Sequence, residues 1–279
     1  MTWLEHWRLR QDPFLGPARG YVPTPTHDEV VARIAASIEA GERLVVLSGG
    51  DGVGKTTTLD RALAETKQPA RRVARVVRPA DGFGMSSTLA KGLGAGASRA
   101  AAWQALSDAV RVSHWQRLHP ILVVDGADEV DRRDLRRLVN LAPDSPAKLT
   151  VILVVREDDP HSPDWRLLVR LQSLTVSESA AYLAAKLAAA GRSEATFTPR
   201  ACQRLHSLSS GVPRGLDRLA SLSLAAGASR GLELVTPDVV DGVRFECTRG
   251  SELLGSRGGI RPPAVSTRSP DWPNASRLC

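Results

Sequence analysis

The sequence predicts an α/β domain, with a parallel sheet of buried strands flanked by helices, followed by a smaller all-helical domain. Three continuous runs of Leu and β-branched residues alternate with segments of helical periodicity; they lie at 44–48, 121–125 and 149–155. Strands that alternate with helices in this way are typical of parallel sheets. After about residue 160 no further segment has a convincing strand pattern, and helix-start signals follow instead.

Length and composition exclude several classes of protein. The chain has 279 residues, of which 42% are hydrophobic and 24% charged, close to the averages for globular proteins. A chain of this length buries a self-sufficient core, which excludes global disorder and a small disulfide scaffold. The apolar runs are shorter than the ~20 residues that span a bilayer, and the N-terminus lacks the apolar segment of a signal peptide. Because the three cysteines are widely spaced, we expect a cytoplasmic protein.

The charge is compatible with nucleic-acid binding but does not indicate it. The net charge is +7, and residues 248–279 contain five arginines against Glu252 and Asp271. A basic chain suits nucleic acid or anionic lipid. The simpler interpretation is a solvated, arginine-rich surface.

The first elements surround a glycine-rich loop. From Asp28 the chain is expected to be helical, because apolar β-branched residues recur every four positions until Gly41 ends the helix. The buried strand 44–48 follows, and after the loop a second helix is expected from Lys55 to about Thr66.

The pattern then repeats along the chain. Alternation predicts a second strand at 71–79, and an Ala- and Leu-rich stretch predicts mostly helix over 85–117. The buried strand 121–125 comes next, then a helix over 131–142, then the strand 149–155.

Three capping signatures predict helices after the sheet. Thr175 and Glu178 form a capping-box pattern, and the helix that they open stops at Gly191. Thr198 and Thr236 each precede a proline, so each places an N-cap residue before proline at the first helical position.

These patterns divide the chain into four parts. We expect an N-terminal extension (1–27) that packs on the core, and a sheet-containing domain (28–171) that includes the glycine-rich loop. A helical domain (172–247) follows. The remaining residues, 248–279, are rich in Gly, Ser, Pro and Arg without periodicity, so we expect a disordered basic tail.

The segment between the first strand and its helix matches the G-x4-G-K-[ST] pattern of a phosphate-binding loop, or P-loop. Glycines allow backbone N–H groups to turn toward a polyphosphate. Lys55 supplies a charge near the β- and γ-phosphates, Thr56 offers a hydroxyl to Mg²⁺, and the helix adds its positive dipole end. An ordinary glycine-rich turn is the alternative, but the position between a buried strand and a helix favours nucleotide binding. The residues expected at the nucleotide are Gly49, Gly50, Asp51, Gly52, Val53, Gly54, Lys55, Thr56 and Thr57.

A second acidic motif follows the strand at 121–125. Asp125 is the candidate for holding the Mg²⁺ shell together with Thr56. Asp128 and Glu129 come shortly after it, and three interpretations stay open. One of the two acids, with Glu129 favoured, orients the attacking water; or hydrolysis is slow and the protein is mainly a nucleotide-gated switch; or both acids only open the next helix as favourable N-terminal charges.

The chain resembles the general secretion pathway protein A (ExeA-type) branch of the AAA+ ATPases, which is related to TniB-type transposition ATPases and origin-recognition-type ATPases. The resemblance covers about residues 3–245. Its N-terminal signature is LEHWRLRQDPF followed by HDEVVARIAASIEAGERLVVLSG. Its second signature is LQSLTVSESAAYLAAKLAAAG followed by FTPRACQRLHSLSSGVPRGLDRLASLSLAAG. This resemblance implies an AAA+ fold in which the helical domain is a lid, and in which Arg214 is the sensor-2 arginine that reaches the γ-phosphate.

The chain departs from that family beside the second acidic motif. A glutamate usually follows the first acid, whereas Gly126 stands here. The spacing D-G-A-D-E resembles the Walker B motif of the signal-transduction (STAND/NACHT) class, in which displaced acids serve the site. Arg156 ends the strand at 149–155 where a polar residue or glycine is usual, although STAND proteins often place arginine there.

The resemblance implies ATP and Mg²⁺ as ligands and ATP hydrolysis as the reaction. We therefore expect an ATPase that couples its nucleotide state to a macromolecular partner, either by self-association or through another protein. The alternative is a nucleotide-gated, DNA-associated adaptor of the TniB or STAND type with little turnover. The sequence contains no guanine-reading N-K-x-D motif, and no membrane segment is expected.

Overall fold

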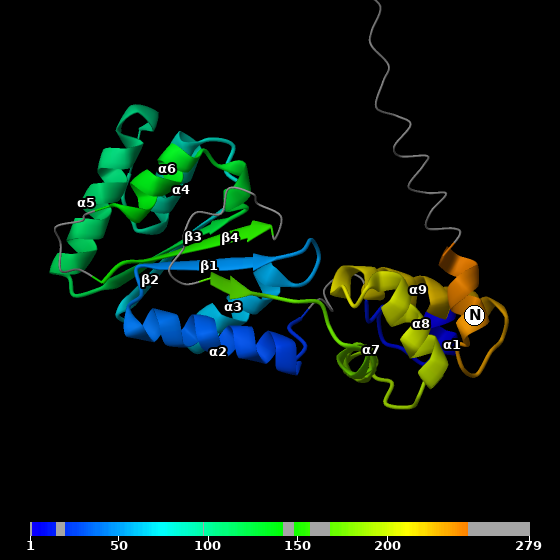
Figure 1. Cartoon of the computed structure of the whole chain (residues 1–279). Coiled ribbons are helices and arrows are strands. Elements are labelled where there is room, and N and C mark those ends of the chain that lie inside the picture. The colour runs from blue at the N-terminus through cyan, green and yellow to red at the C-terminus, as the bar shows by residue number, and fades with distance from the viewer. Residues whose placement is uncertain (1, 15–19, 97, 142–147, 157–167, 245–279) are drawn as a thin grey trace, which may run out of the picture. The chain divides into compact units, whose positions relative to one another are not determined.

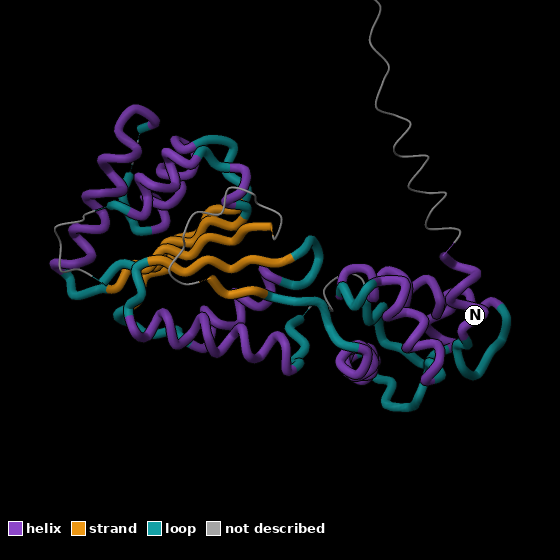
Figure 2. Tube along the Cα trace, in the orientation of Figure 1, coloured by secondary structure: helices purple, strands orange, loops and turns teal. Residues whose placement is uncertain are grey.

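The computed structural model describes residues 2–14, 20–96, 98–141, 148–156 and 168–244. Its centre is a five-stranded parallel sheet in the order β2-β3-β4-β1-β5 (Figures 1 and 2). The strands are β1 (Leu44–Gly49), β2 (Arg71–Val77), β3 (His119–Asp125), β4 (Thr150–Arg156) and β5 (Leu168–Arg170). The predicted α/β fold with a parallel sheet is confirmed.

The fifth strand corrects the expectation that no strand follows residue 160. β5 (Leu168–Arg170) has only three residues, and it pairs in parallel with β1 from Val46↔Leu168 to Ser48↔Arg170. Three residues are too few to show the alternation or the apolar run from which a strand is predicted. These residues form a strand because their backbone pairs with the otherwise unpaired edge of β1.

Two apolar layers hold helices against the sheet (Figure 1). One face carries α2 (Pro25–Ala40) and α3 (Lys55–Glu65), and the other carries α4 (Gly82–Gly92), α5 (Ala102–Trp115) and α6 (Arg132–Val139). Fully buried side chains from both faces fill these layers, among them Ile34, Ile38, Leu59, Leu89, Leu106 and Leu138. Each continuous apolar strand is buried because both of its faces are covered.

Helix α2 begins one turn earlier than its periodicity predicts. Its N-cap is Thr24, whose side chain accepts a hydrogen bond from the backbone N–H of His27, and Pro25 occupies the first helical position. This is the same Thr-Pro start that the sequence shows at Thr198. Gly41 ends α2 in the left-handed conformation, with φ of +74°.

A helical segment follows β5, as predicted. It comprises α7 (Val176–Ala189), α8 (Pro199–Ser209) and α9 (Pro213–Ser229), and residues 237–244 are also helical. Thr175 and Glu178 form the predicted capping box at the start of α7. None of the described helices is long and apolar enough to cross a membrane.

The described part of the N-terminal extension has contacts in both the helical segment and the sheet-containing core. Residues 2–14, which include α1 (Trp3–His6), contact the helical segment, whereas Tyr21 packs against the apolar layer between the sheet and α2 and α3. The buried indole of Trp7 donates a hydrogen bond to the carbonyl of Leu224 at 2.8 Å. A Cβ on Gly227 would lie 3.0 Å from the Trp7 ring, so a glycine on α9 provides the space that this large side chain needs.

The chain divides into two units, one ending at Val243 and the other beginning at Arg244. The boundary that we expected between residues 171 and 172 therefore lies inside the first unit. The predicted basic tail, 248–279, lies outside the described residues.

Candidate nucleotide-binding site

The register of the sheet brings the predicted motifs to one edge. Gly49, the last residue of β1, lies opposite Arg156 of β4, and Asp125 at the end of β3 lies opposite Val154. Because all these strands run parallel, their carboxyl ends meet at the same edge, the usual ligand-binding edge of such sheets. The loop after β1 and the acids after β3 are therefore neighbours in space.

The P-loop needs glycine at residue 52, because the backbone there lies close to Arg214 of α9. Gly52 has φ of +81°, and a Cβ there would lie 2.8 Å from the Cβ of Arg214. The backbone N–H of Arg214 donates to the carbonyl of Gly52 at 3.2 Å. A side chain at residue 52 would thus be strained by its backbone conformation and would push α9 away from the loop.

The side chain of Lys55 folds back and forms hydrogen bonds with the start of the P-loop. Its Nζ donates to the carbonyls of Gly49 and Gly50 at 2.6 and 2.9 Å. Burial is the main cause that lowers the pKa of Lys55, against the opposing effect of nearby carboxylates. The ammonium is thus half-buried at the mouth of the loop, with hydrogen bonds that an anionic ligand could replace.

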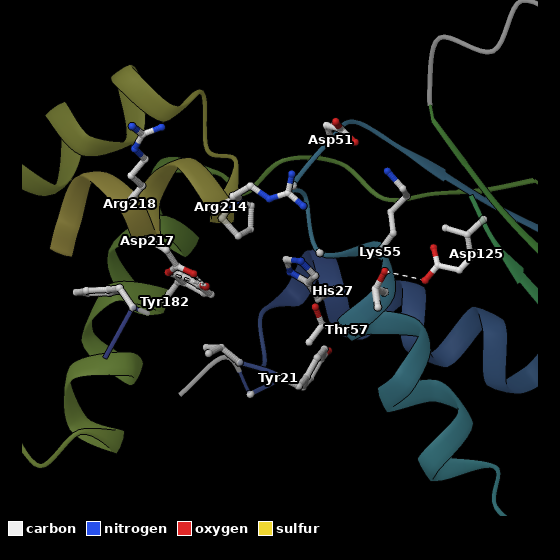
Figure 3. A pocket seen from close by; sticks show the side chains of 18 of the residues that line it. Tyr21, His27, Asp51, Lys55, Thr57, Asp125, Tyr182, Arg214, Asp217 and Arg218 are labelled. Carbon is white, nitrogen blue, oxygen red and sulfur yellow. Dashed lines mark hydrogen bonds between the residues drawn. The ribbon is translucent and has the colours of Figure 1, made fainter. Parts of the chain in front are cut away.

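Thr56 and Asp125 meet across two elements. The Thr56 hydroxyl, on the first turn of α3, donates to Oδ2 of Asp125, at the end of β3, at 3.0 Å (Figure 3). A hydroxyl and a carboxylate are hard oxygen donors of the kind that Mg²⁺ prefers. Mg²⁺ takes few protein ligands and keeps its waters or phosphate oxygens as the others. The residues present therefore fit the metal that the motifs imply.

The two later acids are not in the first turn of the next helix. Asp128 and Glu129 lie in the 3-10 turn Ala127–Glu129, whereas α6 begins at Arg132 with Asp131 as its N-cap. Both acids are therefore N-terminal charges of this short turn rather than of α6.

Arg156, at the end of β4, distinguishes the two acids. Its Nε lies 2.6 Å from Oδ2 of Asp128, whose side chain is only 12% exposed. Its Nη2 lies 3.9 Å from Oε1 of Glu129, whose side chain is 45% exposed. Asp128 is thus held in a close ion pair, while Glu129 is held loosely.

A pocket of about 830 Å³ is lined by most of the P-loop and by the acids that follow β3. Arg214, on the first turn of α9, extends toward the P-loop from the opposite side (Figure 3). The sequence-predicted residues that line the pocket are Asp51, Gly52, Gly54, Lys55, Thr56, Thr57, Asp125, Asp128, Glu129 and Arg214. Gly49, at the end of β1, and Gly50 and Val53, in the loop after it, are not among the lining residues.

Sequence reasoning missed the groups at the other end of the pocket. The Tyr182 hydroxyl of α7 donates to Asp217 of α9 at 3.0 Å, and Nζ of Lys186 donates to the same carboxylate at 3.0 Å. Tyr21, in the chain before α2, also lines this pocket. Helical spacing places Tyr182 and Lys186 on one face, but nothing in the sequence indicates that Asp217 faces them.

His27 is a second omission. It is buried, its Nε2 donates to the carbonyl of Val53 at 2.9 Å, and its Nδ1 lies 2.7 Å from the Thr24 hydroxyl. The start of α2 therefore supports the P-loop from behind. The Thr-Pro-Thr-His sequence signals a helix start but does not show what the histidine contacts.

Comparison with known proteins gives consistent results. Residues 28–155 match a family described as an AAA domain. Over 90% of its length the chain is 27% identical to general secretion pathway protein A of Aeromonas hydrophila, and it spans 51% of that relative. The chain therefore covers about half the length of this curated relative.

Solved structures show the same fold. The chain is similar to a chain in the structure of Drosophila ORC bound to DNA, with a TM-score of 0.68, 20% identity, and coverage of 93% of this chain and 68% of that one. It is also similar to Cdc6p of Pyrobaculum aerophilum, with a TM-score of 0.67, 17% identity, and coverage of 81% and 68%. The resemblance to ExeA-type AAA+ ATPases that the motifs indicate is confirmed.

Proposed function

We propose that this chain, as an AAA+ ATPase similar to general secretion pathway protein A, binds ATP with Mg²⁺, hydrolyses it, and couples its nucleotide state to a macromolecular partner. One observation carries the proposal. Lys55, Thr56 and Asp125 converge at the carboxyl edge of the sheet, and Arg214 faces them across one pocket. This combination of a cationic loop, a hydroxyl–carboxylate pair and a facing arginine suits a nucleoside triphosphate.

The P-loop binds the phosphates in this proposal. Backbone N–H groups of the loop and the positive end of α3 face the anion. Lys55 exchanges its hydrogen bonds to two carbonyls for stronger, charge-assisted bonds to phosphate oxygens. Thr56 and Asp125 hold the Mg²⁺ shell, and Mg²⁺ when bound neutralises charge on the phosphate oxygens.

Glu129 orients the attacking water. The water oxygen bonds to the γ-phosphorus, and the bond from that phosphorus to the β–γ bridging oxygen breaks. One proton of the water stays on the phosphate, the other is released to solvent, and ADP and phosphate leave. Glu129 accepts a hydrogen bond from the water and thereby directs it, a task for which its loose contact with Arg156 leaves it available. Asp128 keeps Arg156 in place beside the site through its close ion pair.

Arg214 couples the site to the helical segment. A bond from its guanidinium to the γ-phosphate forms with ATP and is lost after hydrolysis, so the helical segment acts as a lid that reports the nucleotide state. Self-association or another protein then responds to the position of the lid.

A second candidate function is a nucleotide-gated, DNA-associated adaptor with little turnover. It is favoured by α6, which exposes four arginines, Arg132, Arg133, Arg136 and Arg137. If this candidate is correct, duplex DNA binds with an affinity that falls steeply with salt, because phosphate contacts release counterions.

Calorimetric titration with ATP and Mg²⁺, followed by turnover assays with and without duplex DNA, tests both candidates. We expect Lys55→Ala to weaken ATP binding by about 10- to 100-fold without unfolding the chain, because it removes no core volume. Lys67→Ala, which removes an exposed charge just after α3, is the matched control and should bind as the wild type does. Equal ATP affinity for wild type and Lys55→Ala would overturn the proposal.

A further inference from the structure

The carboxylate expected at the metal is also held by an arginine. Nη2 of Arg75, on β2, donates to Oδ2 of Asp125 at 2.5 Å. Nη1 of the same guanidinium donates to Oδ1 of Asp60, on α3, at 2.5 Å. Arg75 therefore bridges two carboxylates, and only one of them lies in the pocket.

The two carboxylates differ in their exposure to solvent. The side chain of Asp125 is 13% exposed, whereas that of Asp60 is 53% exposed. Water screens the charge of Asp60 much more effectively than that of Asp125. The electrostatic effect of Arg75 is therefore concentrated on Asp125, the less exposed of the two acids.

Register explains why Arg75 reaches Asp125. Arg75 pairs with Val123, two residues before Asp125 on the neighbouring strand. The side chains of Arg75 and Asp125 therefore leave the same face of the sheet.

Nε of Arg75 is buried and has no hydrogen-bond partner among the described residues. An unmet donor costs free energy, and a lysine at this position would avoid that cost while keeping the charge.

We propose that Arg75 is a positioning residue that compensates the charge of Asp125 and thereby sets how strongly nucleotide binding depends on Mg²⁺. The inference rests on the proposed function and concerns the regulation of that same site. A guanidinium on Oδ2, which also accepts the Thr56 hydroxyl, opposes the approach of a divalent cation to the carboxylate. Asp60 weakens this repulsion, because its negative charge partly neutralises the guanidinium of Arg75.

The proposal predicts effects of opposite sign for two neighbouring substitutions. Arg75→Gln leaves the charge of Asp125 uncompensated, so Mg²⁺ should strengthen ATP binding more than in the wild type, by roughly fivefold or more. Asp60→Asn leaves Arg75 to Asp125 alone, so Mg²⁺ should strengthen ATP binding less. A residue with a merely structural role would weaken the site in both variants.

The experiment measures ATP affinity by calorimetry in EDTA and again in saturating Mg²⁺. The ratio of the two dissociation constants is the coupling between metal and nucleotide, and it does not depend on turnover. A wild type that binds no ATP would overturn the proposed function, and this inference with it. If the wild type binds ATP, two outcomes would overturn this inference alone. In the first, Arg75→Gln and Asp60→Asn have the same ratio as the wild type; in the second, both variants have a smaller ratio than the wild type.

Two controls separate charge from folding. Arg72→Gln removes an exposed arginine from the same strand, and its ratio should equal that of the wild type. Arg75→Lys keeps the charge, and its ratio should lie within about threefold of the wild type. If Arg75→Gln does not fold, Asp60→Asn on the exposed side of the bridge still decides the sign, since an unchanged or larger ratio there contradicts the proposal.

Discussion

The carboxylate of Glu178, in the first turn of α7, accepts two hydrogen bonds from Thr26, in the first turn of α2: one from the backbone N–H at 2.7 Å and one from the hydroxyl at 3.0 Å. The same carboxylate accepts the N–H and the hydroxyl of Thr175. His27, adjacent to Thr26, contacts Val53 in the P-loop. A continuous series of bonds therefore joins the P-loop to the helical segment.

We expect Glu178→Gln to lower the free energy of unfolding by about 1–3 kcal/mol, because a neutral amide replaces a buried charge that accepts four hydrogen bonds. Urea denaturation measures this change. The control is Glu39→Gln, an exposed position near the end of α2, where a change within about 0.5 kcal/mol is expected. Equal losses in the two variants would show that the bonds to Thr26 and Thr175 add nothing to stability.

The contribution of Glu178 should disappear in acid. Burial raises the pKa of this carboxyl, but the hydrogen bonds from Thr175 and Thr26 outweigh it and lower the pKa from its ordinary 4.5 to about 2. Since the folded pKa is below the unfolded one, the stabilisation is complete above pH 4.5 and is lost as the pH falls toward 2. The difference in unfolding free energy between the wild type and Glu178→Gln should shrink over this range. A difference that stays constant from pH 6 to pH 2.5 would contradict the assignment.

Arg214→Gln should weaken the binding of ATP by more than about tenfold while changing the affinity for ADP little. The reason is that the proposed bond forms only with the γ-phosphate. Arg200→Gln, an exposed arginine on α8, is the control and should leave both affinities unchanged. Equal losses for ATP and ADP would place Arg214 elsewhere on the nucleotide.

Glu129→Gln should lower turnover by about 10²–10⁴-fold with nearly unchanged affinity for ATP and Mg²⁺, because a water-orienting group acts mainly in the transition state. Asp128→Asn should lower turnover much less, since its close contact is Arg156. Asp125→Asn should instead weaken Mg²⁺-dependent binding. Single-turnover kinetics with parallel binding titrations separate these effects, and wild-type rates in both Glu129→Gln and Asp128→Asn would refute the displaced-acid hypothesis.

Gly126→Glu restores the glutamate that usually follows the first acid, but the structure predicts no gain from it. Gly126 has φ of +89°, and a Cβ there would lie 3.2 Å from Cγ of Arg78. We expect a loss of stability of about 1–2 kcal/mol from the strained backbone and no faster hydrolysis. Gly126→Ala carries the same strain without the carboxylate and serves as the control. Faster hydrolysis in Gly126→Glu alone would show that the loop accepts the acid and that the natural protein is slow because it lacks it.

Local patterns in the sequence determined most of the fold and part of the candidate site. The three apolar runs predict β1, β3 and β4, and the capping box at Thr175 predicts the start of α7, because both signals arise from residues close together in the chain. The G-x4-G-K-T pattern likewise locates the P-loop between a strand and a helix. Asp125 follows from its place at the end of an apolar run.

Tertiary structure alone decided the contacts between distant residues. β5 forms because β1 offers an edge, Trp7 is buried because Gly227 leaves space on α9, and Arg75 reaches Asp125 because β2 and β3 pair in one register. None of these has a local signal, since each depends on how separate elements pack. A shift of the β2–β3 register by one residue would turn Arg75 to the other face of the sheet and away from the carboxylate.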